Sequence, residues 1–298
     1  MYDRIVVAVD ASAEAEHAAR TGMELAAALG VPVDVVNVLE RSILDALRST
    51  SAREELRAER VALLESIEAM TATEGVTVST ALLEGAPAPE IAAFAAESGA
   101  KPLIVLGRQG RSAVSKRLLG GVTERVLQRG TAPVLVDPGT ETDVSLSALS
   151  SILVPTDGSE NAELALPRAG ELASEYAATV HVLSVVDLQR AGGVFNAGGL
   201  DTEFVEGLES RAEAAVGSAR EELLAADTDR TVETAVVRSK DFEGVSGGIA
   251  DYADREAIDL VVMGSHGRSN VNRQLLGSVT STLLRTIDVP VLVVPRGA

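Results

Sequence analysis

The sequence predicts an α/β protein made of two tandem copies of one domain, each with an open five-stranded parallel sheet and helices on both faces. The first observation is that buried, β-branched strand patterns alternate with amphipathic helix patterns, which is typical of parallel sheets. The second is an internal repeat. Residues 5–10 recur as residues 152–157, and residues 103–107 recur as residues 260–264.

The repeat also sets the predicted domain boundaries. Residues 1–138 form the first domain, and residues 150–298 form the second. Residues 139–149 between them are polar and rich in turn formers, so we expect a linker there. The second copy is ten residues longer between its anchors, and we expect the insertion in the segments 192–199 and 239–248.

Each element of the first domain has a local reason. The run 5–9 is a buried strand pattern, and Ser12 is a suitable N-cap for a helix that Gly30 ends. One stripe of that helix is apolar and small, which predicts a buried face: Ala15, Ala18, Ala19, Gly22, Met23, Ala26 and Leu29. Further strands are predicted at 33–39, 76–83, 103–106 and 134–136, and further helices at 52–73, 88–98 and 122–128.

The second domain repeats this order. After the strand at 152–154, Ser159 is the predicted N-cap of one helix with an equivalent buried stripe: Ala162, Ala165, Leu166, Ala169, Leu172 and Ala173. Further strands are predicted at 180–186, 231–237, 260–263 and 291–294, and further helices at 204–226, 246–256 and 279–287.

The charge balance excludes some classes of partner. The chain has 26 Lys and Arg against 44 Asp and Glu, a net charge of −18, whereas an unaided nucleic-acid binder needs clustered cations. Only three of the cations are lysines. An acidic, lysine-poor surface fits a salt-adapted protein, in which screening weakens self-repulsion, and an ordinary acidic cytosolic protein is the alternative.

Cysteine is absent from the sequence and histidine is rare, which restricts the chemistry that the protein can perform. There is no cysteine, which excludes disulfides, thiolate metal sites and a cysteine nucleophile. Three histidines argue against a histidine-rich metal site.

Because there is no export signal and no apolar run of about 18 residues, we expect a cytoplasmic protein with no membrane partner.

The candidate ligand site is a glycine pattern that follows the fourth strand of each copy. Gly264 and Gly267 are followed nine residues later by Gly277 and Ser278 at the start of a helix. The first copy has Gly107, Gly110, Gly120 and Gly121 at the same spacing. Glycine permits close approach of the backbone to a ligand, and a helix start presents free N–H groups to an anion. These positions predict a phosphate site, although each glycine alone is also explained by a turn or cap.

An acidic residue completes the pattern, because Asp10 and Asp157 each end a first strand. Ligands of open α/β sheets bind beyond the carboxyl ends of the strands. The pattern G-x2-G-x9-G-S/T with this Asp resembles the universal stress protein family, over nearly the whole chain. The resemblance implies a Rossmann-like fold of the adenine nucleotide alpha hydrolase-like type, with strand order 3-2-1-4-5. It also implies adenosine nucleotide binding (ATP, ADP or AMP), with or without Mg²⁺.

The resemblance also implies residue roles. In the second copy Asp157 would meet the ribose or a phosphate-bound metal, Val185 would offer backbone groups to adenine, and the motif would hold ribose and phosphates through Gly264, Gly267, Gly277 and Ser278. In the first copy the matching residues are Asp10, Val38, Gly107, Gly110 and Gly120, with Gly121 in place of Ser278. The lost hydroxyl predicts a weaker first site. Arg108, in place of Ser265, is either a compensating phosphate partner or a solvated surface residue.

We therefore expect a stress-response module that senses or stores adenosine nucleotide. A slow ATP hydrolase and a nucleotide-independent scaffold or chaperone-like protein are the alternatives, and the lack of a convincing general base favours binding over catalysis. His266 either approaches a phosphate or faces solvent, and Arg111 and Arg268 are candidate phosphate neighbours. By resemblance, the fifth strands would pair the two domains as an intramolecular pseudo-dimer, and a further homodimer is left open.

Overall fold

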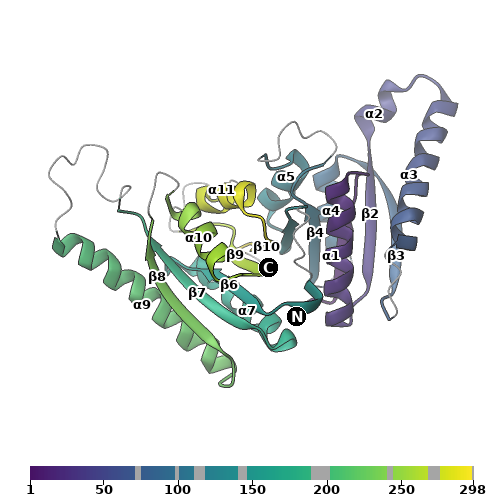
Figure 1. Cartoon of the computed structure of the whole chain (residues 1–298). Coiled ribbons are helices and arrows are strands. Elements are labelled where there is room, and N and C mark those ends of the chain that lie inside the picture. The colour runs from purple at the N-terminus through teal and green to yellow at the C-terminus, as the bar shows by residue number, and fades with distance from the viewer. Residues whose placement is uncertain are drawn as a thin grey trace, which may run out of the picture. The chain divides into compact units, whose positions relative to one another are not determined.

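The computed structural model describes residues 1–70, 75–97, 101–110, 118–139, 146–188, 202–239, 244–267 and 276–296. The chain divides into two compact units (Figure 1), and the boundary in the sequence falls between Ser147 and Ala148. This point lies within the segment that the sequence predicts as a linker. A short 3₁₀ helix, η1 (Leu146–Ala148), spans it.

Unit 1 contains a five-stranded parallel sheet in the order β3-β2-β1-β4-β5. Its strands are β1 (Arg4–Ala8), β2 (Val33–Glu40), β3 (Val78–Gly85), β4 (Pro102–Gly107) and β5 (Val134–Asp137). Its helices are α1 (Ala13–Leu29), α2 (Arg41–Ala46), α3 (Thr50–Met70), α4 (Pro87–Ala96) and α5 (Gly121–Arg129). The central strands β1 and β4 run side by side from Arg4↔Pro102 to Ala8↔Leu106, so the carboxyl ends of these two strands lie together.

Unit 2 repeats this arrangement in the order β8-β7-β6-β9-β10. Its strands are β6 (Ser151–Pro155), β7 (Thr179–Val186), β8 (Val232–Arg238), β9 (Leu260–Gly264) and β10 (Val291–Val294). Its helices are α6 (Glu160–Glu163), α7 (Ala165–Tyr176), α9 (Thr202–Ala226), α10 (Gly244–Arg255) and α11 (Ser278–Thr286). Both units therefore have the order 3-2-1-4-5, and the predicted fold class is confirmed.

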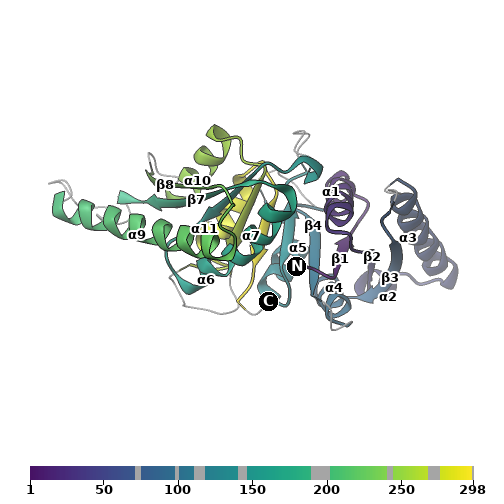
Figure 2. The ribbon, with the colours of Figure 1, turned by 90° about the horizontal axis from the view of Figure 1, so that it is seen from below.

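Helices cover both faces of each sheet. In unit 1, α1 packs on β1, β4 and β5, and α3 packs on β2 and β3, whereas α4 and α5 contact one another. In unit 2, α7 contacts α9, and α10 contacts α11 (Figure 2). Right-handed crossovers explain why the helices lie on both faces. In unit 1 the chain moves toward one edge of the sheet from β1 to β3 and toward the other edge from β4 to β5, so the connecting helices of the two halves lie on opposite faces. The central strands are consequently buried, and Ile5, Ile104, Ile152 and Leu153 are fully inaccessible.

The first helix of unit 1 forms as its sequence predicts. Ser12 caps it, with its Oγ accepting from the Ala15 N–H at 3.1 Å, and Gly30 ends it in the left-handed conformation. The small stripe lets the helix lie close to the sheet. A Cβ placed on Gly22 would come within 2.7 Å of Val7 Cγ2, so this position has no room for a side chain.

The corresponding prediction for unit 2 is only partly right, because the single predicted helix is broken into α6 and α7 at Leu164. Pro167 explains the break, since it has no N–H to donate to the Glu163 carbonyl and its ring would clash with that group. The short helix α2 was not predicted. Of the two expected insertion segments, 192–199 lies outside the described residues, while 244–248 forms the start of α10.

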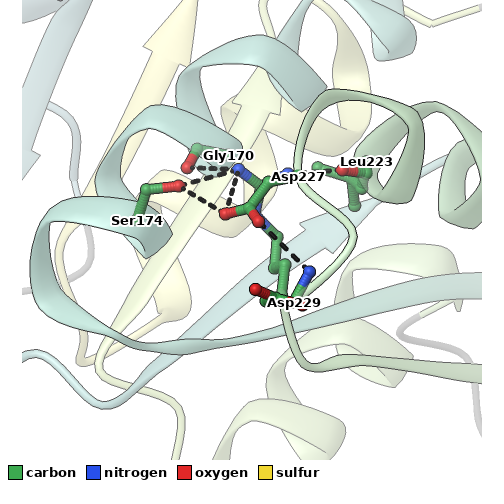
Figure 3. A network of polar contacts seen from close by, with 6 residues as sticks. Gly170, Ser174, Leu223, Asp227 and Asp229 are labelled. Carbon is green, nitrogen blue, oxygen red and sulfur yellow. Dashed lines mark hydrogen bonds and ion pairs between the residues drawn. The ribbon is translucent and has the colours of Figure 1, made fainter.

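A buried arginine connects two helices of unit 2 (Figure 3). Arg230, between α9 and β8, donates from Nη1 to the Leu223 carbonyl at 2.5 Å, and from Nη2 to the Gly170 carbonyl at 3.0 Å and Ser174 Oγ at 2.9 Å. Its side chain is 6% exposed, and Asp227 Oδ2 lies 3.7 Å from Nη2. The guanidinium therefore connects α7 to the C-terminal end of α9.

We expect Arg230→Met to destabilise the protein by about 2–4 kcal/mol, because the Leu223 and Gly170 carbonyls would lose their charged donor in a buried place. Urea unfolding followed by circular dichroism measures this change. Arg211→Met is the matched control, since Arg211 is an exposed arginine that also donates to a backbone carbonyl, at Gly207. Equal unfolding midpoints for the two variants would show that the Arg230 network contributes no more than a surface contact.

Candidate functional site: two equivalent cavities

A cavity of about 360 Å³ lies at the carboxyl ends of the strands in unit 2. All six residues that the sequence assigns to the second site line it: Asp157, Val185, Gly264, Gly267, Gly277 and Ser278. They come from the end of β6, from β7, from the end of β9 and its following loop, and from the start of α11. The volume lies within the range of small-molecule sites, about 300–1,000 Å³.

Unit 1 has an equivalent cavity of about 320 Å³. It is lined by the six residues that the sequence assigns to the first site: Asp10, Val38, Gly107, Gly110, Gly120 and Gly121. The structure therefore brings together both predicted sets, each within its own unit. We call the two hollows cavity 1 and cavity 2.

The aspartate of each cavity is held by the cap of the following helix. Asp10 Oδ1 accepts from the Ser12 Oγ at 2.6 Å and from its N–H at 3.2 Å. Asp157 makes the same two bonds with Ser159, at 2.6 and 3.1 Å. The residue between them has a positive φ in both units, 65° at Ala11 and 72° at Gly158. This turn fixes the carboxylate at the cavity wall.

The glycines of the motif are required by close contacts rather than by flexibility. A Cβ on Gly267 would lie 2.8 Å from Asp157 Oδ2, and a Cβ on Gly110 would overlap Asp10 Oδ2. A Cβ on Gly107 would lie 3.0 Å from the Glu14 carbonyl oxygen, and one on Gly264 would overlap the Asn161 carbonyl oxygen. Each carboxylate consequently faces a glycine, and each fourth strand ends against the backbone of the first helix.

The loop after the fourth strand closes onto the start of the last helix. The Gly120 N–H donates to the Arg108 carbonyl at 2.8 Å, and the Gly277 N–H donates to the Ser265 carbonyl at 2.9 Å. Within the described parts of the chain, no side chain makes a capping hydrogen bond to α5 or α11. The first N–H groups of a helix have no partner within the helix, so this end of each cavity is suited to an anion.

Sequence reasoning missed a threonine that secures this loop. Thr280 Oγ1 donates to the Gly264 carbonyl at 3.2 Å, and Thr123 Oγ1 donates to the Gly107 carbonyl at 2.9 Å. Both threonines are buried and line their cavities. The signal was available, because Val-Thr follows Gly120-Gly121 in the first copy and Gly277-Ser278 in the second.

An apolar wall was also missed. In cavity 1 it consists of Pro87 and Ile91 of α4, and in cavity 2 of Val245 and Ile249 of α10. Helical spacing of this kind resembles ordinary core packing, so the sequence gives little signal for it. Helix α10 also approaches β7 closely, since a Cβ on Gly248 would lie 2.7 Å from Val185 Cγ1.

The two loops differ in their inner residues. Arg108 is 7% exposed and is not part of the lining of cavity 1, so the prediction of a solvated surface arginine is wrong, and the described structure does not bring it to the cavity either. Gln109 lines cavity 1 and donates from Nε2 to the Leu118 carbonyl at 2.5 Å. In unit 2 the equivalent pair is Ser265 and His266, and His266 lines cavity 2.

The glycine loop of unit 1 is anchored to a buried aspartate. The Arg108 N–H donates to the Asp137 carbonyl at 2.6 Å. The Asp137 carboxylate is fully buried, accepts from Thr21 Oγ1, and lies 2.8 Å from His17 Nδ1. The hydrogen bond to Asp137 raises the pKa of His17 above its ordinary value. These contacts connect α1, β5 and the loop.

The described residues of both cavities offer contacts for a phosphate and an apolar wall for a flat ring. They contain no group of three His, Asp or Glu side chains that could hold a metal ion. Arg111 and Arg268, the other predicted phosphate neighbours, lie outside the described residues. None of the described helices has the length and apolarity to cross a membrane.

Comparison with known proteins agrees with this arrangement. The model of the universal stress protein family matches twice, over residues 1–138 and 149–295. Universal stress protein Rv2005c of Mycobacterium tuberculosis is 29% identical over 302 residues, which cover 97% of this chain and 96% of that protein.

Solved structures give a similar result. A universal stress protein from Archaeoglobus fulgidus superposes with a TM-score of 0.73 at 22% identity, covering 99% of this chain and 96% of that one. At this identity the likeness concerns the fold. Another universal stress protein, solved in complex with cAMP, is 26% identical and covers 50% of this chain and 98% of its own, with a TM-score of 0.37.

We expect His17→Gln to lower the melting temperature most at acidic pH. Because the folded pKa of His17 is raised, its contribution to stability is fully present below the unfolded value of about 6.5. That contribution is lost as the pH rises through the folded pKa. Melting curves of both proteins between pH 5.5 and 9 measure the difference, and a difference that stays constant or grows with pH would contradict this linkage.

We expect Thr280→Val to cost about 1–2 kcal/mol, because the buried Gly264 carbonyl loses a hydrogen bond while the side-chain volume is kept. Hydrogen exchange should also become faster at the start of α11. Thr286→Val is the control, since Thr286 is exposed and donates to a carbonyl of its own helix. Exchange that is unchanged in Thr280→Val would show that the hydroxyl does not secure the loop.

Proposed function

Because the chain belongs to the universal stress protein family, we propose that it is a nucleotide-binding module of the stress response, in which each cavity takes one adenosine nucleotide. The observation that carries the proposal is the assembly of the same six positions around a cavity in both units, at the carboxyl ends of the strands. Ligands of open α/β sheets bind at this place.

The geometry of cavity 2 supports a phosphate at one end and a purine at the other. The uncapped N-terminus of α11, with Gly277 and Ser278, accepts the phosphates through N–H groups and a hydroxyl. Asp157 lies where a ribose hydroxyl can donate to it. The apolar wall of Val245 and Ile249 packs against the base, whose edge is read by the backbone of Val185.

The close contacts of the glycines fit this ligand. A Cβ would lie 2.8 Å from Asp157 Oδ2 on Gly267 and 3.2 Å from the Ser265 carbonyl oxygen on Gly277, so both positions favour glycine and the backbone of the loop lines the cavity. A nucleotide phosphate can therefore approach main-chain N–H groups directly, as it does in other glycine-rich phosphate sites. The volumes of both cavities, about 320 and 360 Å³, suit a small ligand.

Cavity 1 binds the same ligand more weakly. Its helix α5 begins with Gly121 where α11 has Ser278, so one hydroxyl donor is missing. A hydrogen bond to a charged group contributes about 1.5–3 kcal/mol, which corresponds to roughly tenfold or more in affinity.

A binding role is preferred to ATP hydrolysis. Hydrolysis requires a positioned water and a residue that orients it. Among the described residues that line the two cavities, the ionisable side chains are Asp10, Glu40, Asp157 and His266, and both aspartates are held by the serines of the helix caps. Nucleotide binding that regulates a partner needs no residue that orients an attacking water.

Two reciprocal variants test the proposal by calorimetric titration of Mg-ATP. Ser278→Ala should weaken the tighter site by roughly tenfold or more. Gly121→Ser should strengthen the weaker site by a similar factor, and the structure leaves room for it, because the nearest group to a Cβ there is Arg125 Nη2 at 3.8 Å.

A sample of the protein should first be extracted with acid to detect copurified nucleotide, and the remainder should be freed of nucleotide by unfolding and refolding before the titration. If the stripped protein binds no ATP, ADP or AMP, the nucleotide proposal is wrong and a scaffold role becomes the better one. If ATP binds at equal affinity in both sites and Ser278→Ala has no effect, the assignment of the helix N-termini to the phosphates is wrong.

A further inference from the structure

The apolar wall of cavity 2 is carried by one helix. Val245 and Ile249 both belong to α10 and lie one turn apart. The neighbouring strand β7 contributes Leu183 and Val185 to the same lining. The position of α10 on β7 therefore sets the shape of the cavity on the side that would receive the base.

Helix α10 lies directly on β7. A Cβ on Gly248 would lie 2.7 Å from Val185 Cγ1, so the backbone of the helix contacts the side chain of the strand. Side chains two residues apart in a strand point to the same face, which places His181 on the Val185 face of β7. Residues four apart share one side of a helix, which places Tyr252 on the Gly248 side of α10. These two side chains consequently meet in the same contact between helix and strand.

A hydrogen bond joins the two side chains. His181 Nδ1 lies 3.1 Å from Tyr252 Oη, and the rings meet edge to face, with centroids 6.0 Å apart and an interplanar angle of 70°. His181 is 7% exposed and Tyr252 is 4% exposed. Glu233 Oε2 of β8 lies 3.6 Å from the same imidazole nitrogen. The pair is thus a buried polar contact between β7 and α10, and neither residue belongs to the lining of cavity 2.

The surroundings of Tyr252 keep its hydroxyl available for this bond. Burial, together with Glu256 and Glu233, raises the pKa of Tyr252, so the phenol keeps its proton and can donate or accept. The Arg255 guanidinium lies over the ring, 4.9 Å from its centroid. Moving α10 away from β7 would leave buried polar atoms without this partner, which is costly. The bond therefore favours one position of the helix, which apolar packing alone specifies less sharply.

Unit 1 links the corresponding strand and helix in another way. In the repeat, Asp34 stands at the position of His181. Its Oδ2 lies 2.6 Å from Arg4 Nη2 of β1, and its Oδ1 accepts from Ser79 Oγ of β3. The Arg4 guanidinium lies over the Phe94 ring of α4, 5.1 Å from its centroid. This link runs through an intervening arginine, whereas the link in unit 2 is direct.

We propose that His181 and Tyr252 are positioning residues of cavity 2, whose hydrogen bond fixes α10 on β7 and thereby holds the apolar wall in place for the base. This inference rests on the proposed nucleotide binding. The two residues act through Val245 and Ile249 of the same helix and do not touch the ligand. When a wall moves among several positions, only the fraction of molecules in the correct one binds, and the apparent affinity falls by that fraction.

Calorimetric titration of ATP into the full chain, freed of nucleotide, tests this role. Tyr252→Phe removes the hydroxyl and keeps the ring. We expect it to bind ATP about three- to tenfold more weakly in the tighter site, which Ser278→Ala identifies as cavity 2, with the other site unchanged. His181→Leu should weaken the same site by a similar factor. His181→Asn should restore most of the affinity, because its side-chain amide places a polar group near the position of Nδ1.

Two further measurements separate positioning from a general loss of stability. In the His181→Leu background, Tyr252→Phe should have no additional effect on ATP affinity, because its partner is already missing. In the ligand-free chain, amide hydrogen exchange should become faster in α10 of Tyr252→Phe and stay unchanged in α4. Arg230→Met is the matched control, since it destabilises unit 2 at α7 and α9 and should leave the ATP affinity unchanged.

Ser278→Ala distinguishes the ways in which the test can fail. If Ser278→Ala weakens ATP binding while Tyr252→Phe and His181→Leu follow the unaltered protein, the positioning role is overturned and the nucleotide site stands. An equal loss of affinity in Arg230→Met would attribute the effect to stability and overturn the role as well. If the unaltered protein binds no ATP, the proposed function is wrong, and unchanged exchange of α10 in Tyr252→Phe would separately show that the bond does not hold the helix.

Discussion

The structure of each cavity depends on one steric constraint, the absence of a side chain at the end of the fourth strand. Gly107 and Gly264 let the backbone of the first helix meet the end of this strand directly. The approach brings the aspartate that precedes the helix opposite the loop that follows the strand. That loop in turn closes onto the last helix through a backbone hydrogen bond. Any side chain at these glycines would separate the parts that form the cavity.

On this common frame the two units have diverged in polar detail. In unit 1 the loop is bonded to the carbonyl of Asp137, whose buried carboxylate contacts Thr21 and the part-exposed His17, and the inner loop residue is an amide. Unit 2 has Val294 at the position of Asp137, and its loop carries a serine–histidine pair. The two units thus share their main-chain geometry, while the side chains around the loop differ.

The sequence predicted the fold and the placement of the twelve site residues because both depend on local rules. Strand and helix patterns have different periods, and glycine spacing reflects backbone contacts that recur in each copy. The break at Leu164 could have been predicted from Pro167, but the small apolar residues on both sides have the regular spacing of one continuous helix. Packing was harder to predict. The burial of Arg108 and the apolar walls of Ile91 and Ile249 depend on elements far apart in the chain. Thr280 was missed because a threonine in a helix looks ordinary until its carbonyl partner is known.

The turn after the first strand affects how variants of the two aspartates can be interpreted. Ala11 has a positive φ of 65°, a conformation that disfavours any residue with a Cβ, whereas its counterpart Gly158 adopts it without strain. In unit 1 the side-chain bonds of Asp10 to Ser12 therefore hold a strained backbone in place. Removing Asp10 would release the turn as well as delete a carboxylate, so a defect would have two causes. Removing Asp157 also deletes two bonds to Ser159 but releases no strain at Gly158, so unit 2 is the copy in which the effect of the carboxylate is simpler to interpret.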